Sequence, residues 1–119
     1  MQFYKDINGK YAEVFLKLRE ILLSFQDIKE TKNAKQTSYS DSYAIVAMMR
    51  DRGDKFVFAL GKGYVLQEKY PFLEGDGKIV RHMYFYDMSD VNEALIREII
   101  EETLVLNMEA DERKRLKKT

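Results

Sequence analysis

The chain has 119 residues, of which 45% are hydrophobic and none is cysteine. This length suits one domain with a single core, so we expect residues 1–119 to form one domain. A chain without cysteine has no disulfide, thiolate metal site or thiol nucleophile, and it fits a reducing cytoplasm. Twenty basic and twenty acidic residues give a formal net charge of zero, which argues against a general nucleic-acid binder. No apolar run approaches the roughly 20 residues of a membrane span, so we expect a soluble, cytoplasmic protein.

The first half of the chain predicts one long helix followed by strands. Apolar residues recur at three- and four-residue steps from about Gly9 to Phe25, which is typical of a helix that covers a core. The polar stretch 29–35 predicts a short or edge strand. Alternating apolar residues predict a strand from Ser38 to Met49.

The middle of the chain predicts hairpins. Residues 50–54 contain Gly53 and predict a tight turn before a strand from Lys55 to Leu60. Residues 61–63 predict a bend or bulge, and a short strand follows from Tyr64 to Gln67.

The last part of the chain predicts a turn, a strand and a second helix. Two glycines turn the chain at 75–77, and Lys78 to Tyr86 form the last strand. We expect Ser89 to cap a helix that passes Leu106. The chain then ends in a basic tail at about 109–119, of which 113–118 looks like a frayed end. The fold class is therefore α+β: an antiparallel sheet of four or five strands with the N- and C-terminal helices packed on one face. The opposite face is left open for solvent, a ligand or a partner.

One segment carries a family resemblance. Residues 73–106 contain a Leu-Glu-Gly-x-Gly-Lys turn, then Arg81-His82, then a helix with the run Ile-Arg-Glu-Ile-Ile. In this combination the chain resembles the YdhG-like family, a group described as a domain of unknown function, over about residues 11–106. The resemblance implies a frataxin-like helix–sheet–helix shape, and an iron-chaperone role has been proposed for one branch. Where the family commonly carries a Trp-Gly pair and a proline, this chain has Ala34, Lys35 and Thr37.

His82 is the only histidine, and two interpretations of it stay open. Strand alternation places His82 with Val80 and Tyr84 on the open face, and places Arg81 near the rim of the core face. His82 is then either a structural hydrogen-bonding residue or part of a ligand site. A lone imidazole without a paired nucleophile does not make a catalytic site, so we predict no enzyme activity and no cofactor.

Carboxylates on the second helix do not predict a metal site. Asp90, Glu93 and Glu101 form a stripe, but Arg97 lies inside that stripe and would repel a cation. A solvated helix face explains these residues.

Our leading hypothesis is a small non-catalytic module that binds a small molecule or a partner protein on the open face of its sheet. The alternatives are an intracellular iron-binding protein, from the family resemblance alone, and a structural protein that forms a homodimer through the open face. The candidate ligand-binding residues are Tyr39, Tyr43, Lys62, Arg81, His82 and Tyr84.

Overall fold

The computed structural model describes residues 1–118 and contains one five-stranded sheet. All neighbouring strands are antiparallel and follow one another along the chain, in the order β1–β2–β3–β4–β5. The strands are β1 (Lys29–Lys32), β2 (Thr37–Ser40), β3 (Ile45–Asp51), β4 (Phe56–Leu60) and β5 (Arg81–Phe85). The helices are α1 (Gln2–Ile7), α2 (Ala12–Leu23), α3 (Gly63–Lys69), a short 3-10 turn η1 (Met88–Asp90) and α4 (Glu93–Lys117). The predicted α+β class with an antiparallel sheet is confirmed.

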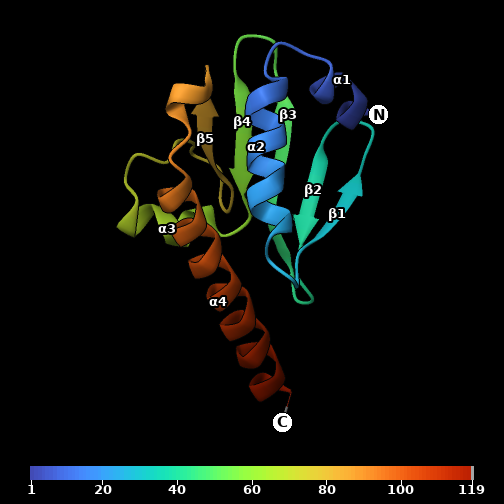
Figure 1. The fold of residues 1–119 in the computed structure, drawn as a ribbon. Helices are drawn as coiled ribbons and strands as arrows, with labels where there is room; N and C mark the ends of the chain where they lie inside the picture. The colour runs from blue at the N-terminus through green and yellow to red at the C-terminus, as the bar shows by residue number, and fades with distance from the viewer. Residues whose placement is uncertain (119) are drawn as a thin grey trace.

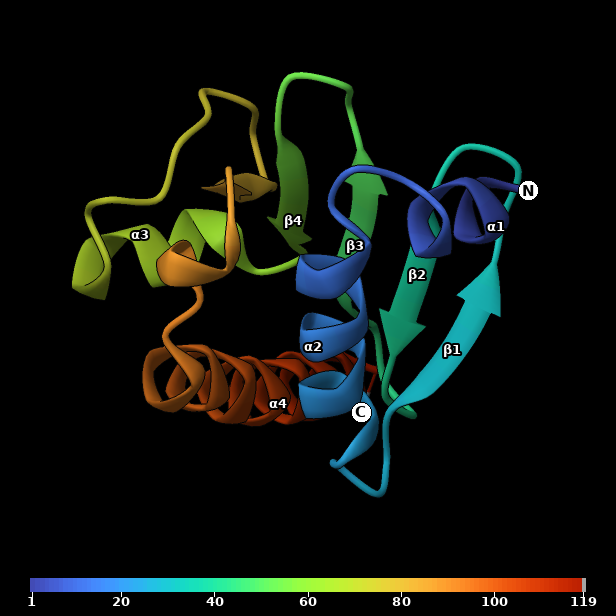
Figure 2. The ribbon, with the colours of Figure 1, turned by 45° about the horizontal axis from the view of Figure 1, so that its top comes forward.

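The helices α2 and α4 lie on one side of the sheet and enclose the core with it (Figure 1). The side chains of Phe15 in α2, Phe58 in β4 and Ile99 in α4 are fully buried in this layer. An ion pair of 2.9 Å between Lys17 Nζ and Glu93 Oε1 links the two helices at the surface. Turning the molecule shows α2 and α4 crossing each other on that side (Figure 2).

Strand β4 shows how the sequence separates the two faces of the sheet. Successive side chains of a strand point to opposite faces. Phe56, Phe58 and Leu60 belong to the core under the helices, whereas Val57 and Ala59 point to the other face. Burying each large apolar side chain of the first set stabilises the fold by about 1.5–3 kcal/mol.

Two predicted elements in the first half are wrong in extent. The N-terminal residues form α1, a separate short helix, so the predicted single helix is preceded by another one. The predicted strand from Ser38 to Met49 is two strands, because Asp41 turns the chain between them. Its Oδ1 accepts hydrogen bonds of 2.8 Å from the backbone N–H groups of Tyr43 and Ala44. This local bonding is a common way for Asp to start a turn.

The predicted strand from Tyr64 to Gln67 is wrong, because these residues lie in α3. Gly63, Leu66 and Tyr70 are buried, and their spacing of three and four residues is that of a helix. Helix α3 begins very close to β5. A Cβ atom on Gly63 would lie 2.3 Å from the backbone nitrogen of Arg81, so only glycine fits there.

The start of the last helix also differs from the prediction. Ser89 does not cap it; Asp87 caps η1 by accepting a hydrogen bond from the Ser89 N–H, and Asn92 caps α4. The Asn92 Oδ1 atom accepts a hydrogen bond of 3.1 Å from the Leu95 N–H. Asparagine is a favoured residue at this position.

Helix α4 continues to Lys117, so the prediction of a frayed end from Arg113 is wrong up to that residue. Residue 119 lies outside the described part of the chain. An ion pair of 2.6 Å between Asp111 and Arg115, four residues apart, supports this end of the helix. None of the helices within residues 1–118 is both long and apolar enough to cross a membrane.

Candidate functional site

The open face of the sheet carries His82 and Tyr84, as the strand alternation predicts. His82 pairs with Ala59 across the β4–β5 ladder and Tyr84 pairs with Val57, so these four side chains share the face that the helices do not cover. The rings of His82 and Tyr84 stack nearly parallel, with centroids 5.9 Å apart. Lys55 Nζ lies 4.1 Å from the centroid of the Tyr84 ring, a cation–π contact.

A hollow of about 600 Å³ opens on this face beside His82, and we call it the basin. Its wall includes the turn between β1 and β2, and its floor includes β3 and β4. The lining residues are Asn33, Ala34, Lys35, Gln36, Met48, Met49, Arg50, Arg52, Val57, Ala59, Val80 and His82. The basin therefore joins an apolar floor to a polar, basic wall.

The charges around the basin are all of one sign. Lys35, Arg50 and Arg52 line it, and none of its lining residues is Asp or Glu. Within residues 1–118, no side-chain hydrogen bond or ion pair involves any of these three cations. No carboxylate among the lining residues offsets these cations, although Asp51 lies between Arg50 and Arg52 in the chain and the chain as a whole is neutral.

His82 is held in place by its backbone. Its N–H donates to the Glu74 carbonyl at 2.7 Å and its carbonyl accepts from the Glu74 N–H at 2.9 Å. The Nδ1 atom is buried and has no hydrogen-bond partner among residues 1–118. Gly75 packs against it so closely that a Cβ there would lie 3.2 Å from Nδ1. His82 is therefore fixed at the wall of the basin.

Tyr39 does not lie on the open face, so its predicted place in the site is wrong. It is fully buried under the helices, and its hydroxyl donates a hydrogen bond of 2.8 Å to Glu30 Oε2. Arg19 Nε donates to the same oxygen at 2.7 Å. Burial and the Glu30 carboxylate raise the pKa of Tyr39 far above its usual value. Burial by itself raises the pKa of Glu30, but the hydrogen bonds from Arg19 and Tyr39 outweigh it and lower the pKa.

Arg81 points to the helix side of the sheet and is engaged in structural contacts. Its Nε donates to Gln67 Oε1 at 2.9 Å, which ties β5 to α3. Its Nη1 donates to the carbonyls of Gly77 and Val80 and so holds the loop before β5. Arg81 does not line the basin.

Tyr43 and Lys62 lie away from the basin as well. Tyr43 is in the turn between β2 and β3, with 44% of its surface exposed, and Lys62 precedes α3. Of the six predicted residues, the structure brings only His82 and Tyr84 together on this face.

The sequence interpretation missed the cations of the basin. The prediction places Arg50 and Arg52 only in the hairpin turn at 50–54. The pairing of Arg50 with Val57 across that hairpin places Arg50 on the same face as Val57. Register counted outward from Gly53, whose φ is +94°, would have revealed this.

Within residues 1–118 there is no group of three or more His, Cys, Asp or Glu side chains that could hold a metal ion. Comparison of the chain with family models, with curated proteins and with solved structures found no match. The resemblance to the YdhG-like family therefore stays a prediction.

Proposed function

We propose that the protein is a non-catalytic binding module that takes a small anionic molecule in the basin. One observation carries this proposal: Lys35, Arg50 and Arg52 surround an apolar floor without any carboxylate in the lining. Unneutralised cations close together are unfavourable in the free protein, and an anion that neutralises them gains that energy on binding.

The residue types suit a phosphate or carboxylate group on a flat apolar body. A guanidinium group presents a planar fork of N–H donors that matches both anions. Val57 and Ala59, which are 5% and 8% exposed, give the body of the ligand a small apolar contact at the floor of the basin. The basin volume of about 600 Å³ lies within the range of ordinary small-molecule sites, roughly 300–1,000 Å³.

Catalysis finds no support in the basin. A nucleophile or acid–base pair needs a second group within hydrogen-bond reach of the imidazole. Among the lining residues within the described chain, His82 is accompanied by no Ser, Thr, Cys, Asp or Glu. A cytoplasmic location is also part of the proposal, supported by the lack of cysteine in the sequence, and cell fractionation tests it.

The two alternative functions have weaker support. Iron delivery calls for clustered oxygen ligands, and the described residues supply no such cluster. A two-fold homodimer whose axis passes through the basin would set Arg50 and Arg52 close to the same residues of the second copy. That arrangement is repulsive. Anaerobic titration with ferrous iron, followed by NMR, tests the first alternative.

NMR titration with inorganic phosphate, citrate and adenosine monophosphate tests the proposal. We expect shifts of the backbone N–H signals of Arg50, Val57, Ala59 and His82, and an affinity that falls as salt is added. The variant Arg50→Gln/Arg52→Gln is expected to weaken binding by about tenfold or more, since charge-assisted hydrogen bonds are lost.

The control Lys5→Gln/Lys10→Gln removes the same charge from exposed positions outside the basin and is expected to bind as the natural chain does. Equal weakening of binding in both variants would mean that net charge, rather than the position of the arginines in the basin, sets the affinity. Shifts that cluster away from the basin, or no binding of any anion, would contradict the proposal.

A further inference from the structure

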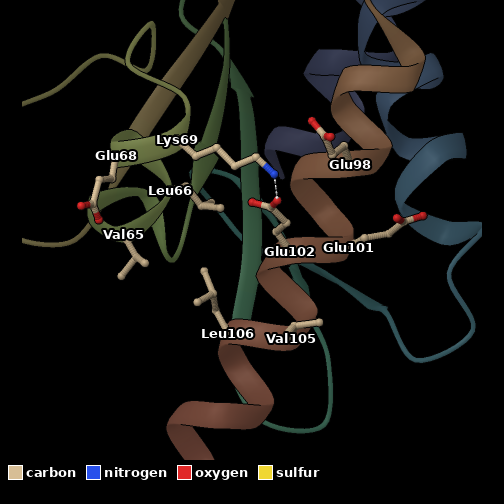
Figure 3. Close-up of a pocket in the computed structure, with 9 residues that line it drawn as sticks. All are labelled: Val65, Leu66, Glu68, Lys69, Glu98, Glu101, Glu102, Val105 and Leu106. Carbon is tan, nitrogen blue, oxygen red and sulfur yellow. Dashed lines mark hydrogen bonds and ion pairs between the residues drawn. The ribbon is translucent and has the colours of Figure 1, made fainter.

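A second hollow, also of about 600 Å³, lies between α3 and α4, and we call it the groove. Its floor is apolar, with Val65 and Leu66 contributed by α3 and Val105 and Leu106 contributed by α4 (Figure 3). Half of the surface of Val105 is exposed. An occupant of the groove would therefore bury apolar surface that now faces water.

The rim of the groove is acidic. It carries Glu68, Glu98, Glu101 and Glu102 and a single cation, Lys69, which is bonded to Glu102 (Figure 3). Glu98 accepts a hydrogen bond of 2.9 Å from the hydroxyl of Tyr70. Glu68 and Glu101 make no hydrogen bond or ion pair through their side chains with any of residues 1–118. The groove thus favours a cationic occupant.

The far end of α4 has the opposite charge. Every residue from Glu112 to Lys118 is exposed, and we call residues 113–118 the basic end. The basic end has five cations and no carboxylate: Arg113, Lys114, Arg115, Lys117 and Lys118. Helix α4 therefore carries carboxylates along its length up to Glu112 and ends in a run of cations, and it extends away from the sheet (Figure 1).

The basic end cannot reach the groove of its own chain. At 1.5 Å per residue, Lys117 lies about 24 Å along the helix axis from Glu101. A continuous helix does not fold back over that distance. The cations that match the groove must come from another molecule, and a second copy of this chain carries them in a helix that is already formed.

We propose that two copies of the chain form a two-fold dimer in which the α4 helices run antiparallel and each basic end lies over the groove of the other copy. Two-fold symmetry makes both contacts identical, so one rotation satisfies both grooves and both basic ends. Antiparallel helix dipoles add a small favourable term. The groove shares no residue with the basin, so this dimer does not depend on the proposed ligand.

The charge pairs at such a rim are partly exposed, so each contributes little and all are weakened by salt. The apolar floor supplies the remaining affinity. We expect a weak dimer in which the dissociation constant rises about tenfold between about 0.05 M and 0.5 M salt.

Sedimentation equilibrium of four samples tests the dimer. The groove variant is Glu68→Lys/Glu101→Lys and the basic-end variant is Arg113→Glu/Lys117→Glu, all at exposed positions with no ion pair to the rest of residues 1–118. Each variant alone is expected to be monomeric. An equal mixture of the two variants is expected to form a one-to-one heterodimer, because each reversed groove then meets a reversed end. The control Glu13→Lys changes an exposed carboxylate of α2 and is expected to dimerise like the natural chain.

Three outcomes would overturn the proposal. One is a natural chain that stays monomeric at low salt up to the highest concentration reached. Another is a dimer that both variants leave unchanged, which would place the interface elsewhere, for example on the open face. The last is loss of the dimer in each variant without recovery in the mixture, which would show that the groove and the basic end do not meet. Circular dichroism of each variant confirms that its helices are intact.

Discussion

The two faces of the sheet differ in whether their charged side chains have hydrogen-bond or ion-pair partners. On the helix side, Arg19, Glu30 and Tyr39 form a closed network in which each polar group has a partner. On the open side, Arg50 and Arg52 line the basin, and no Asp or Glu is among its lining residues. A closed network stabilises the fold, whereas cations without partners can form new favourable interactions with an anionic ligand. The comparison separates the residues that hold the structure from those that we assign to binding.

The largest expected change in the free energy of unfolding comes from a core residue of β4, and its neighbour in the same strand serves as the comparison. Phe58→Ala removes a fully buried ring under the helices and is expected to lower the free energy of unfolding by about 3–5 kcal/mol. Val57→Ala, on the open face, is expected to cost about 1–2 kcal/mol, because fewer atoms are removed. Urea unfolding followed by circular dichroism measures both. Equal losses would mean that the Phe58 ring contributes no more to the core than the smaller Val57 side chain.

The contact between α3 and β5 gives the next largest effect. Gly63→Ala puts a Cβ atom 2.3 Å from the Arg81 nitrogen and 2.5 Å from its Cβ, so the two backbones must separate. We expect a loss of about 2–3 kcal/mol in the free energy of unfolding. Gly77→Ala is the control, because the nearest atom to its new Cβ lies 3.9 Å away. Similar losses in both variants would argue against close packing at Gly63.

The network under the helices predicts a pH dependence. The pKa of Glu30 is lowered in the folded chain, so its contribution to stability is present above the usual value of 4.5 and is lost as the pH falls through the folded pKa. Glu30→Gln is expected to lower the free energy of unfolding at pH 7 by about 1–2 kcal/mol. It should also make the fall in stability between pH 5 and pH 3 less steep than in the natural chain.

Unfolding curves at several pH values measure this slope. Glu13→Gln, at an exposed position of α2, serves as the control and should keep the natural slope. An unchanged slope in Glu30→Gln would show that the network does not hold this carboxylate in its ionised form.

The smallest expected effect on stability belongs to the basin. Arg50→Gln/Arg52→Gln is expected to change the free energy of unfolding by no more than about 0.5 kcal/mol, because both side chains are exposed and lack partners in residues 1–118. The same variant weakens anion binding in the proposed function. Thermal unfolding with and without phosphate measures both properties. A large loss of stability would show that these arginines help to stabilise the fold.

The general fold was predictable because its main signals are periodic. The alternation at 56–60 and the helical spacing of apolar residues in α2 and α4 each identify one buried face. The segment from Tyr64 misled the prediction because tyrosine and valine favour strands. Tertiary packing decided otherwise, since only a helix buries Gly63, Leu66 and Tyr70 together.

The candidate site was only partly predictable. Simple alternation along β5 placed His82 correctly, because that strand is regular from Arg81 to Phe85. Tyr39 was misplaced because alternation along 38–49 groups it with Ala47 and Met49 but does not say which face is the core. Tyr39 pairs with Ala47, and both lie in the core under the helices. Arg50 and Arg52 were missed since residues near a turn have no fixed face until the pairing across the hairpin is known.

The outer edges of the sheet bear on how this protein avoids aggregation. Free strand edges are templates for pairing with other chains, and charged residues on them discourage it. Strand β1, which forms one edge, consists of Lys29, Glu30, Thr31 and Lys32, and at the other edge the backbone of Glu74 already occupies part of β5. Both edges therefore resist growth into fibrils, and we expect concentrated solutions to stay free of amyloid unless the Glu74 segment is displaced.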